Sequence, residues 1–330
     1  MKSNLIKLCL FVAAAAAVPV ILCAADQAAP AKPAKRAEVK RAPAVKPTEA
    51  DVHYGAATNQ VLDFYKAESA APTPLVFFIH GGGWQHGDKK GVSGLADYLA
   101  AGISVASIQY RFTDEAKTAG AKPPVDWPLK DAAHALQFVR SKAAEWNIDK
   151  KRIGASGGSA GACSSLWLAF HDDLADPKSS DPVARESTRL MCAAVTGAQT
   201  SLDPKQMKEW IPNIGYGGHA FGFSADSAKK TSQFQAFLDG RETILPWIKE
   251  YSPYELVSKD DPPVYLIYSF VPAIGQTQSN ATHSANFGVK LQEHLRDAGV
   301  ACELVYPGAP DVKHKTMQEY LIETLKQPAK

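Results

Sequence analysis

The sequence is poor in cysteine: it contains five, and Cys9 and Cys23 lie near its N-terminus. The other three, Cys163, Cys192 and Cys302, are odd in number and widely spaced, which argues against a disulfide framework. One disulfide among them stays open in an oxidising compartment. No metal-ligand spacing of Cys and His occurs either. We therefore expect neither a metal site nor a cofactor.

A strong net charge and a long hydrophobic run are also missing. The formal net charge is +2, which gives no reason to expect a nucleic-acid partner. The longest apolar run, 8–22, is too short for a stable membrane span, but with Lys2 and Lys7 before it and Ala25 after it, it is typical of a secretory signal. We expect export, with cleavage after residue 25. Lipid attachment at Cys23 is the minor alternative, because the bulky Leu22 before it fits that pattern poorly.

The chain after the expected signal has two parts. Residues 26–50 are rich in Ala, Pro and Lys and cannot bury a core, so we expect a disordered linker. Residues 51–330 alternate apolar runs with helical patterns. The predicted strands are 61–65, 75–79, 103–110, 152–155, 191–196, 263–268 and 301–306, and the predicted helices are 92–101, 127–146, 162–170, 284–298 and 316–325.

Such alternation predicts an α/β fold with a mostly parallel sheet and helices on both faces. Residues 52–66 are expected to begin it as a hairpin. Residues 205–261 break the rhythm and are rich in Gly, Pro and aromatic residues. A connection of that length is typical of a functional insertion. We expect a cap over the active-site edge, in which most aromatic residues simply pack.

The residues around Ser159 fit the G-x-S-x-G pattern of a nucleophile elbow, a sharp turn from a strand into a helix. The small residues Gly157, Gly158, Ala160 and Gly161 suit so tight a turn. The pattern alone also matches an ordinary glycine-rich turn before a buried helix. A second motif supports the catalytic interpretation, because a buried strand at 75–79 runs into His80 and three glycines.

Together these motifs resemble the HGGG-type esterases of the α/β-hydrolase fold, which include hormone-sensitive-lipase-like carboxylesterases and feruloyl- and acetyl-xylan-esterase-like enzymes. The resemblance covers residue 52 to the C-terminus apart from the cap. It implies that Ser159 is the nucleophile and that backbone N–H groups of Gly82, Gly83 and Ala160 form the oxyanion hole. His80 is expected to support the glycine loop.

The family order of serine, acid and histidine points to His314, which follows the last predicted strand. His134 and His171 lie within or at the end of helices and fit less well. His283 precedes a helix and is interpreted as a cap-region or supporting residue.

The sequence departs from the family at the catalytic acid. The family has an Asp in the loop after the penultimate strand, but here that loop, at 269–283, contains neither Asp nor Glu. Three possibilities stay open for the third residue of the catalytic triad, beside the serine and the histidine. It is Asp203 after the preceding strand, an amide at Asn280 or Gln276 that replaces the acid, or it is absent and the site is weakened. Asp203 also suits a simple turn before Pro204. Asp311 lies in the histidine's own loop and is less suited.

Two function classes remain. The first is an exported serine esterase for small carboxylic esters, including acyl groups on carbohydrate, working through an acyl-serine. The second is a degenerate hydrolase that binds an ester or glycan with little turnover. Hydrolysis of amides would use the same machinery. The sequence leaves the oligomeric state open.

Overall fold

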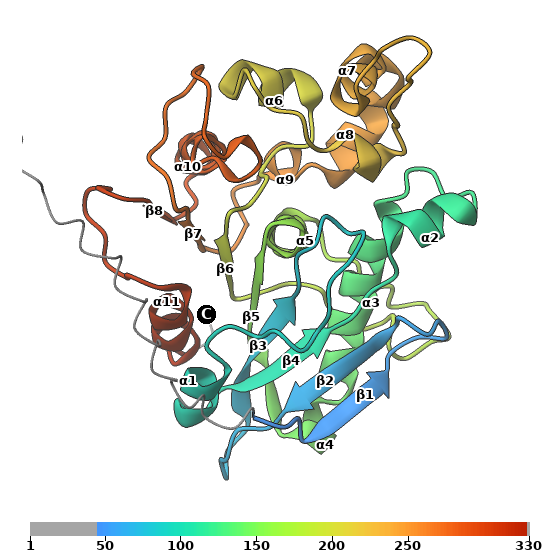
Figure 1. Ribbon diagram of the computed structural model, residues 1–330. Coiled ribbons are helices and arrows are strands. Elements are labelled where there is room, and N and C mark those ends of the chain that lie inside the picture. Colours follow the sequence, from blue (N-terminus) through green and yellow to red (C-terminus); the bar gives the residue numbers. More distant parts are fainter. Residues whose placement is uncertain (1–44, 329–330) are drawn as a thin grey trace, which may run out of the picture. The chain divides into compact units, whose positions relative to one another are not determined.

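Figure 1 shows the computed structural model, which describes residues 45–328. The expected signal sequence and the expected linker up to residue 44 lie outside the described residues. The first strand begins at Glu49, just before the expected end of that linker. Within residues 45–328, no helix has the length and apolar character needed to cross a membrane.

An eight-stranded sheet forms the centre of the fold, in the order β1-β2-β4-β3-β5-β6-β7-β8. Its strands are β1 (Glu49–His53), β2 (Val61–Tyr65), β3 (Thr73–Ile79), β4 (Ser104–Ile108), β5 (Ile148–Gly158), β6 (Cys192–Thr196), β7 (Val264–Ile267) and β8 (Cys302–Val305). The pairs β1–β2 and β2–β4 are antiparallel, and every other neighbouring pair is parallel. The mostly parallel sheet and the initial hairpin are therefore confirmed.

The central strand β3 shows why its sequence has no polar alternation. Leu75, Phe77 and Ile79 join one buried apolar cluster, and Val76 and Phe78 join another. Successive side chains of a strand point to opposite faces of the sheet. Both faces are covered here, so every position of β3 is apolar or small and buried.

Helices cover both faces of the sheet, as predicted (Figure 1). One face carries α3 (Asp126–Ser141), α4 (Ala143–Trp146), α5 (Ala160–Phe170) and α10 (Asn286–Ala298), and the other carries α1 (Leu95–Ala100) and α11 (Met317–Leu325). A short helix, α2 (Thr113–Thr118), precedes α3. The predicted helix 127–146 is divided at Lys142 into α3 and α4. The three cysteines outside the N-terminal region are free thiols.

The expected cap is a helical insertion between β6 and β7. It consists of α6 (Pro204–Trp210), η1 (Gly218–Phe221), α7 (Gln233–Asp239), η2 (Arg241–Ile244), α8 (Leu245–Tyr251) and α9 (Pro253–Leu256). Its aromatic rings mostly pack on one another, with Phe221 5.5 Å from Phe237 and 6.3 Å from Trp247 between ring centroids. α9 contacts α5, the helix that follows Ser159.

Candidate active site

Ser159 occupies a strained turn between β5 and α5, with φ 54° and ψ −120°. Its backbone N–H donates to the Thr196 carbonyl at 3.0 Å. The flanking glycines have no room for a side chain, because a Cβ on Gly157 or Gly161 would lie 2.4 or 2.0 Å from the Ile79 oxygen. A non-glycine residue held at positive φ is costly and is often found at functional sites. The local geometry is therefore that of a nucleophile elbow.

The glycine loop after β3 lies directly against this elbow. A Cβ on Gly81 would be 2.6 Å from the Gly158 oxygen. Gly82 and Gly83 have φ values of 108° and 62°, which favour glycine. Within the described part of the chain, the N–H groups of Gly82, Gly83 and Ala160 have no protein acceptor. They are thus free to donate to a substrate oxygen, and their assignment as the oxyanion hole stays a prediction.

Buried side chains hold the glycine loop in place. His80 Nδ1 donates to the Gly81 carbonyl at 2.7 Å, and its ring stacks on Tyr110 with 4.3 Å between centroids. Tyr110 Oη donates in turn to the His80 carbonyl at 2.9 Å. Trp84 Nε1 donates to Ser164 Oγ on α5 at 2.9 Å. Burial lowers the pKa of His80, which suits the supporting role expected for a neutral ring.

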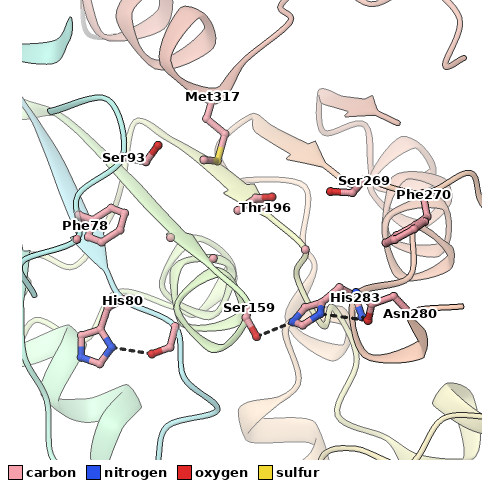
Figure 2. A pocket seen from close by; sticks show the side chains of 15 residues that line it. Phe78, His80, Ser93, Ser159, Thr196, Ser269, Phe270, Asn280, His283 and Met317 are labelled. Atoms are coloured by element: carbon pink, nitrogen blue, oxygen red, sulfur yellow. Dashed lines mark hydrogen bonds between the residues drawn. The ribbon is translucent and has the colours of Figure 1, made fainter. Parts of the chain in front are cut away.

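His283 is the histidine that contacts Ser159, with Nε2 3.0 Å from Ser159 Oγ (Figure 2). It ends η3 (Ala281–His283), a single turn in the loop between β7 and α10. Gly197 leaves room for this ring, because a Cβ at position 197 would lie only 3.3 Å from His283 Cδ2. Burial lowers the pKa of the half-buried His283, so the neutral form that accepts a proton is favoured.

Asn280 fixes the tautomer of that ring. Asn280 Oδ1 lies 3.2 Å from the backbone N of His283 and 3.3 Å from its Nδ1. The backbone N–H can only donate, so the side-chain atom facing it must be the amide oxygen. The same oxygen then accepts from Nδ1–H, which leaves the lone pair on Nε2, facing Ser159. Asn280 therefore orients the base correctly, although it supplies no negative charge.

The prediction of His314 as the base of Ser159 is wrong in this structure. Both of its ring nitrogens are occupied by carboxylates, with Nδ1 2.7 Å from Glu303 and Nε2 3.0 Å from Glu323. Tyr265 Oη also donates to the His314 carbonyl at 3.1 Å. Burial lowers the pKa of His314, but the hydrogen bonds that its ring donates to the two carboxylates outweigh burial and raise the pKa overall. His314 ties β8 to α11 and does not reach the serine.

Asp203 is not the third member either. It caps α6 by accepting from the backbone N–H of Lys205 at 2.8 Å, and Arg241 binds both of its oxygens at 2.7 and 2.6 Å. Its carboxylate is thus fully committed to the cap insertion. Gln276 is exposed, and no hydrogen bond joins its side chain to a histidine within residues 45–328. Of the candidates for the third member, only Asn280 reaches an imidazole, and that imidazole belongs to His283.

Ser159 and His283 open into a pocket of about 490 Å³. Figure 2 shows Phe78 and His80 to one side of Ser159, and Asn280, Ser269 and Phe270 on the side of His283. No carboxylate of residues 45–328 hydrogen-bonds the His283 ring. The same residues contain no cluster that could hold a metal. The groups present can support nucleophilic attack by a serine with an imidazole as base.

Known proteins with similar sequences are named as esterases. The chain is 31% identical over 153 residues to Gut esterase 1 of Caenorhabditis elegans, covering 45% of this chain and 27% of that protein. It is 25% identical over 230 residues to Esterase LipC of Mycobacterium tuberculosis, covering 66% and 49%. The chain therefore spans only a quarter to a half of the length of these relatives.

Solved structures resemble the chain over a greater share of their length. A truncated carbohydrate esterase from gut microbiota aligns with TM-score 0.60 and 20% identity over 84% of this chain and 96% of that one. The acetyl ester-xyloside bifunctional hydrolase of Caldicellulosiruptor lactoaceticus aligns with TM-score 0.55 and 24% identity over 74% and 76%. The sheet order, the elbow and these likenesses define an α/β-hydrolase.

The family is defined more narrowly by a model named BD-FAE, which matches residues 62–284, more than half of the chain. The chain belongs to the BD-FAE family. The matched segment begins in β2 and ends directly after His283, so it includes the glycine loop, Ser159, Asn280 and His283. His314 lies beyond it. The resemblance to HGGG-type esterases inferred from the motifs is thereby confirmed.

Proposed function

We propose that this protein is a serine esterase that hydrolyses small carboxylic esters with Ser159 as nucleophile and His283 as base. The observation that carries the proposal is the 3.0 Å contact between His283 Nε2 and Ser159 Oγ beside the glycine loop. The lowered pKa of His283 adds support, because a neutral imidazole is the form that accepts a proton near neutral pH.

The proposed reaction has two steps. Nε2 of His283 takes the proton of Ser159 as Oγ attacks the ester carbonyl, and the resulting oxyanion receives hydrogen bonds from the N–H groups of Gly82, Gly83 and Ala160. The imidazolium then protonates the leaving alcohol, and an acyl-serine remains. Water, deprotonated by the same Nε2, attacks the acyl-serine, and the imidazolium returns the proton to Ser159 Oγ as the acid is released. Among residues 45–328, the developing cation has Asn280 beside it but no hydrogen-bonded carboxylate.

Paired histidine variants test the assignment. His283→Gln should lower kcat for p-nitrophenyl acetate by about a hundredfold or more, because the proton acceptor is lost. His314→Gln should leave kcat close to that of the wild type. Ser159→Ala should abolish turnover and labelling by a serine-directed fluorophosphonate. The opposite result, loss of turnover in His314→Gln with full turnover in His283→Gln, would overturn the proposal. It would identify His314, at the position after the last strand where the family has its histidine, as the base.

A second candidate function is supported by the missing carboxylate. A degenerate hydrolase would bind an ester and turn it over very slowly, since an amide cannot balance the imidazolium charge. Stopped-flow measurements with p-nitrophenyl acetate separate the two. Steady turnover that depends on Ser159 supports the esterase, whereas one stoichiometric burst without further product supports the degenerate enzyme.

Two finer proposals concern the substrate and the location. The names of two structural neighbours support acyl esters of carbohydrate as substrates, and release of acetate from acetylated xylan tests this. The apolar run at residues 8–22 with Lys2 and Lys7 before it supports export. N-terminal sequencing of the protein from the medium or periplasm should find a start near Asp26. A mass increase from lipid on Cys23 would instead support the anchored form.

A further inference from the structure

One segment of the cap contacts both loops that carry the proposed catalytic groups. It comprises residues 210–219, here called the connecting segment, which starts at the last residue of α6 and ends in η1. Within the described part of the chain, no residue of the cap lines the catalytic pocket. The connecting segment therefore reaches the site through the two loops that it contacts.

His219 holds the glycine loop. Its Nε2 lies 2.9 Å from the Gly83 carbonyl oxygen, and because a carbonyl only accepts, this nitrogen donates. Burial lowers the pKa of His219, so the ring is neutral and its single N–H is committed to this bond. The Gly82 carbonyl accepts from the N–H groups of Gln85 and His86 at 3.0 and 3.2 Å. Both peptide planes next to Gly83 are thus fixed, one of them from the cap.

The position of His219 is itself determined by neighbouring residues. The backbone N–H of Val125, at the start of α3, donates to the Ala220 carbonyl at 3.0 Å and ties η1 to the body of the domain. The ring of Tyr216 packs edge-on against that of His219, with 4.9 Å between centroids. A Cβ on Gly83 would lie 3.3 Å from Tyr216 Oη. The cap therefore packs against Gly83 as well as bonding it.

Asn213 and Trp210 hold the loop between β7 and α10. Asn213 Oδ1 accepts from the backbone N–H of Gln278, and Asn213 Nδ2 donates to the Gln278 carbonyl, both at 2.9 Å. The Trp210 carbonyl accepts from the backbone N–H of Gly275 at 3.0 Å and from Asn286 Nδ2 at 2.8 Å. The start of the connecting segment is thus bound to this loop by four hydrogen bonds.

These bonds lie close to the base in the sequence. Gln278 precedes Asn280 by two residues and His283 by five. Figure 2 shows His80, where the glycine loop begins, and His283 on opposite sides of Ser159. Both loops must act on one ester, and a misplacement of about 1 Å costs roughly a hundredfold in rate.

We propose that the connecting segment sets the positions of both catalytic loops relative to Ser159. His219 is a positioning residue for the N–H of Gly83. Asn213 is a positioning residue for His283. The inference rests on the proposed esterase function. Each side chain acts through a loop and not on the substrate, so its loss should lower kcat with little change in KM.

Three His219 variants test the oxyanion side. His219→Ala should lower kcat for p-nitrophenyl acetate by about thirtyfold, since loss of a whole oxyanion donor costs about a hundred- to a thousandfold. His219→Gln places an amide N–H near the position of Nε2 and should stay within about threefold of wild type. His219→Phe keeps a ring without a donor and serves if the alanine variant does not fold. Wild-type kcat without the donor, or equal losses with and without it, would overturn the assignment.

A comparison in two backgrounds tests the base side. Asn213→Ala should lower kcat by about tenfold in the wild type, but it should change little in His283→Gln, because the group that Asn213 positions is already absent. His219→Ala should still lower the residual turnover of His283→Gln, since an oxyanion hole works without the base. Equal losses from Asn213→Ala in both backgrounds would show a general structural effect and contradict the role of Asn213.

Asp203→Ala is the matched control in the same insertion. The Asp203 side chain binds Arg241 and the backbone of Lys205, so the substitution weakens the cap without removing a bond to either loop. Its kcat should stay close to that of the wild type. A loss of kcat as large as that of His219→Ala, accompanied by lower stability, would attribute the effect to cap stability and overturn the proposal.

Amide hydrogen exchange tests the connecting segment without any turnover. If the wild type hydrolyses no ester, the proposed function fails, but the positions of the loops can still be measured. His219→Ala should speed exchange at least fivefold in residues 82–86 alone. Asn213→Ala should do so in residues 275–283 alone, including the N–H of His283. Unchanged exchange in the matching loop, or equal acceleration of both loops by either variant, would refute the proposal.

Discussion

Replacing Asn280 by Asp should turn the uncharged support of His283 into a charged one. The side chains have nearly the same shape, so the backbone N–H of His283 and its Nδ1–H keep an oxygen acceptor at 3.2 and 3.3 Å. What changes is a negative charge beside the ring that becomes a cation in the transition state. The substitution therefore isolates the value of the charge from that of the orientation.

The expected gain follows from the distance between the charges. Two unit charges about 4 Å apart attract by about 4 kcal/mol at an effective dielectric constant of 20, and by about 1 kcal/mol in water. Asn280 and His283 are both partly exposed, which places the pair between these limits. A stabilisation of about 2 kcal/mol corresponds to roughly a thirtyfold increase in kcat. This increase is smaller than the roughly ten-thousandfold effect on kcat of the buried carboxylate in a Ser-His-Asp triad.

The pH dependence gives a second readout. Burial lowers the pKa of His283 in the wild type, so the neutral base persists to lower pH. A carboxylate at position 280 raises that pKa, and the loss of activity on the acid side should begin at higher pH. The kcat–pH profile with p-nitrophenyl acetate measures both effects. Gln276→Glu adds the same charge at an exposed position of the same loop and should do neither. An unchanged kcat together with an unchanged acid limb would refute the contact between Asn280 and His283.

Two further predictions concern the residues that the structure removes from the site. His314 has a raised pKa, so its ion pairs with Glu303 and Glu323 should add stability below about pH 6.5 that is lost as pH rises through the folded pKa. The difference in unfolding free energy between wild type and His314→Gln should therefore be larger at pH 6 than at pH 9 in urea titrations, and an equal or reversed difference would contradict the ion pairs. Asp203→Ala should lower the unfolding free energy by about 3 kcal/mol, because Arg241 loses its buried partner and α6 loses its cap, while kcat changes little. A collapse of kcat at full stability would return Asp203 to the catalytic site.

Local patterns were sufficient for most of the fold. The strand at 75–79 is apolar throughout because β3 is buried on both faces, and this alone distinguishes a central parallel strand from an edge strand. The elbow at Ser159 is predictable because its G-x-S-x-G pattern is local, although the backbone that crowds Gly157 and Gly161 comes from Ile79, far away in the sequence. Features determined by neighbouring residues can be read from a sequence.

Which histidine contacts Ser159 cannot be predicted from local patterns. His314 and His283 each follow a strand at the same edge of the sheet, and the choice between them depends on which partners surround the ring. Glu303 and Glu323 come from β8 and α11 and meet at His314 only in the folded chain. The signal available in the sequence was the Asn280-x-x-His283 spacing in a loop without acids, because Asn is a good cap for a short helical turn.

The loop between β7 and α10 carries both the proposed base and the amide that orients it, within the four consecutive residues from Asn280 to His283. Residues of a single short segment move, are deleted and are exchanged together. An insertion in this loop would therefore move the proposed base and its orienting amide at once, while Ser159 between β5 and α5 and the glycine loop after β3 stay in place.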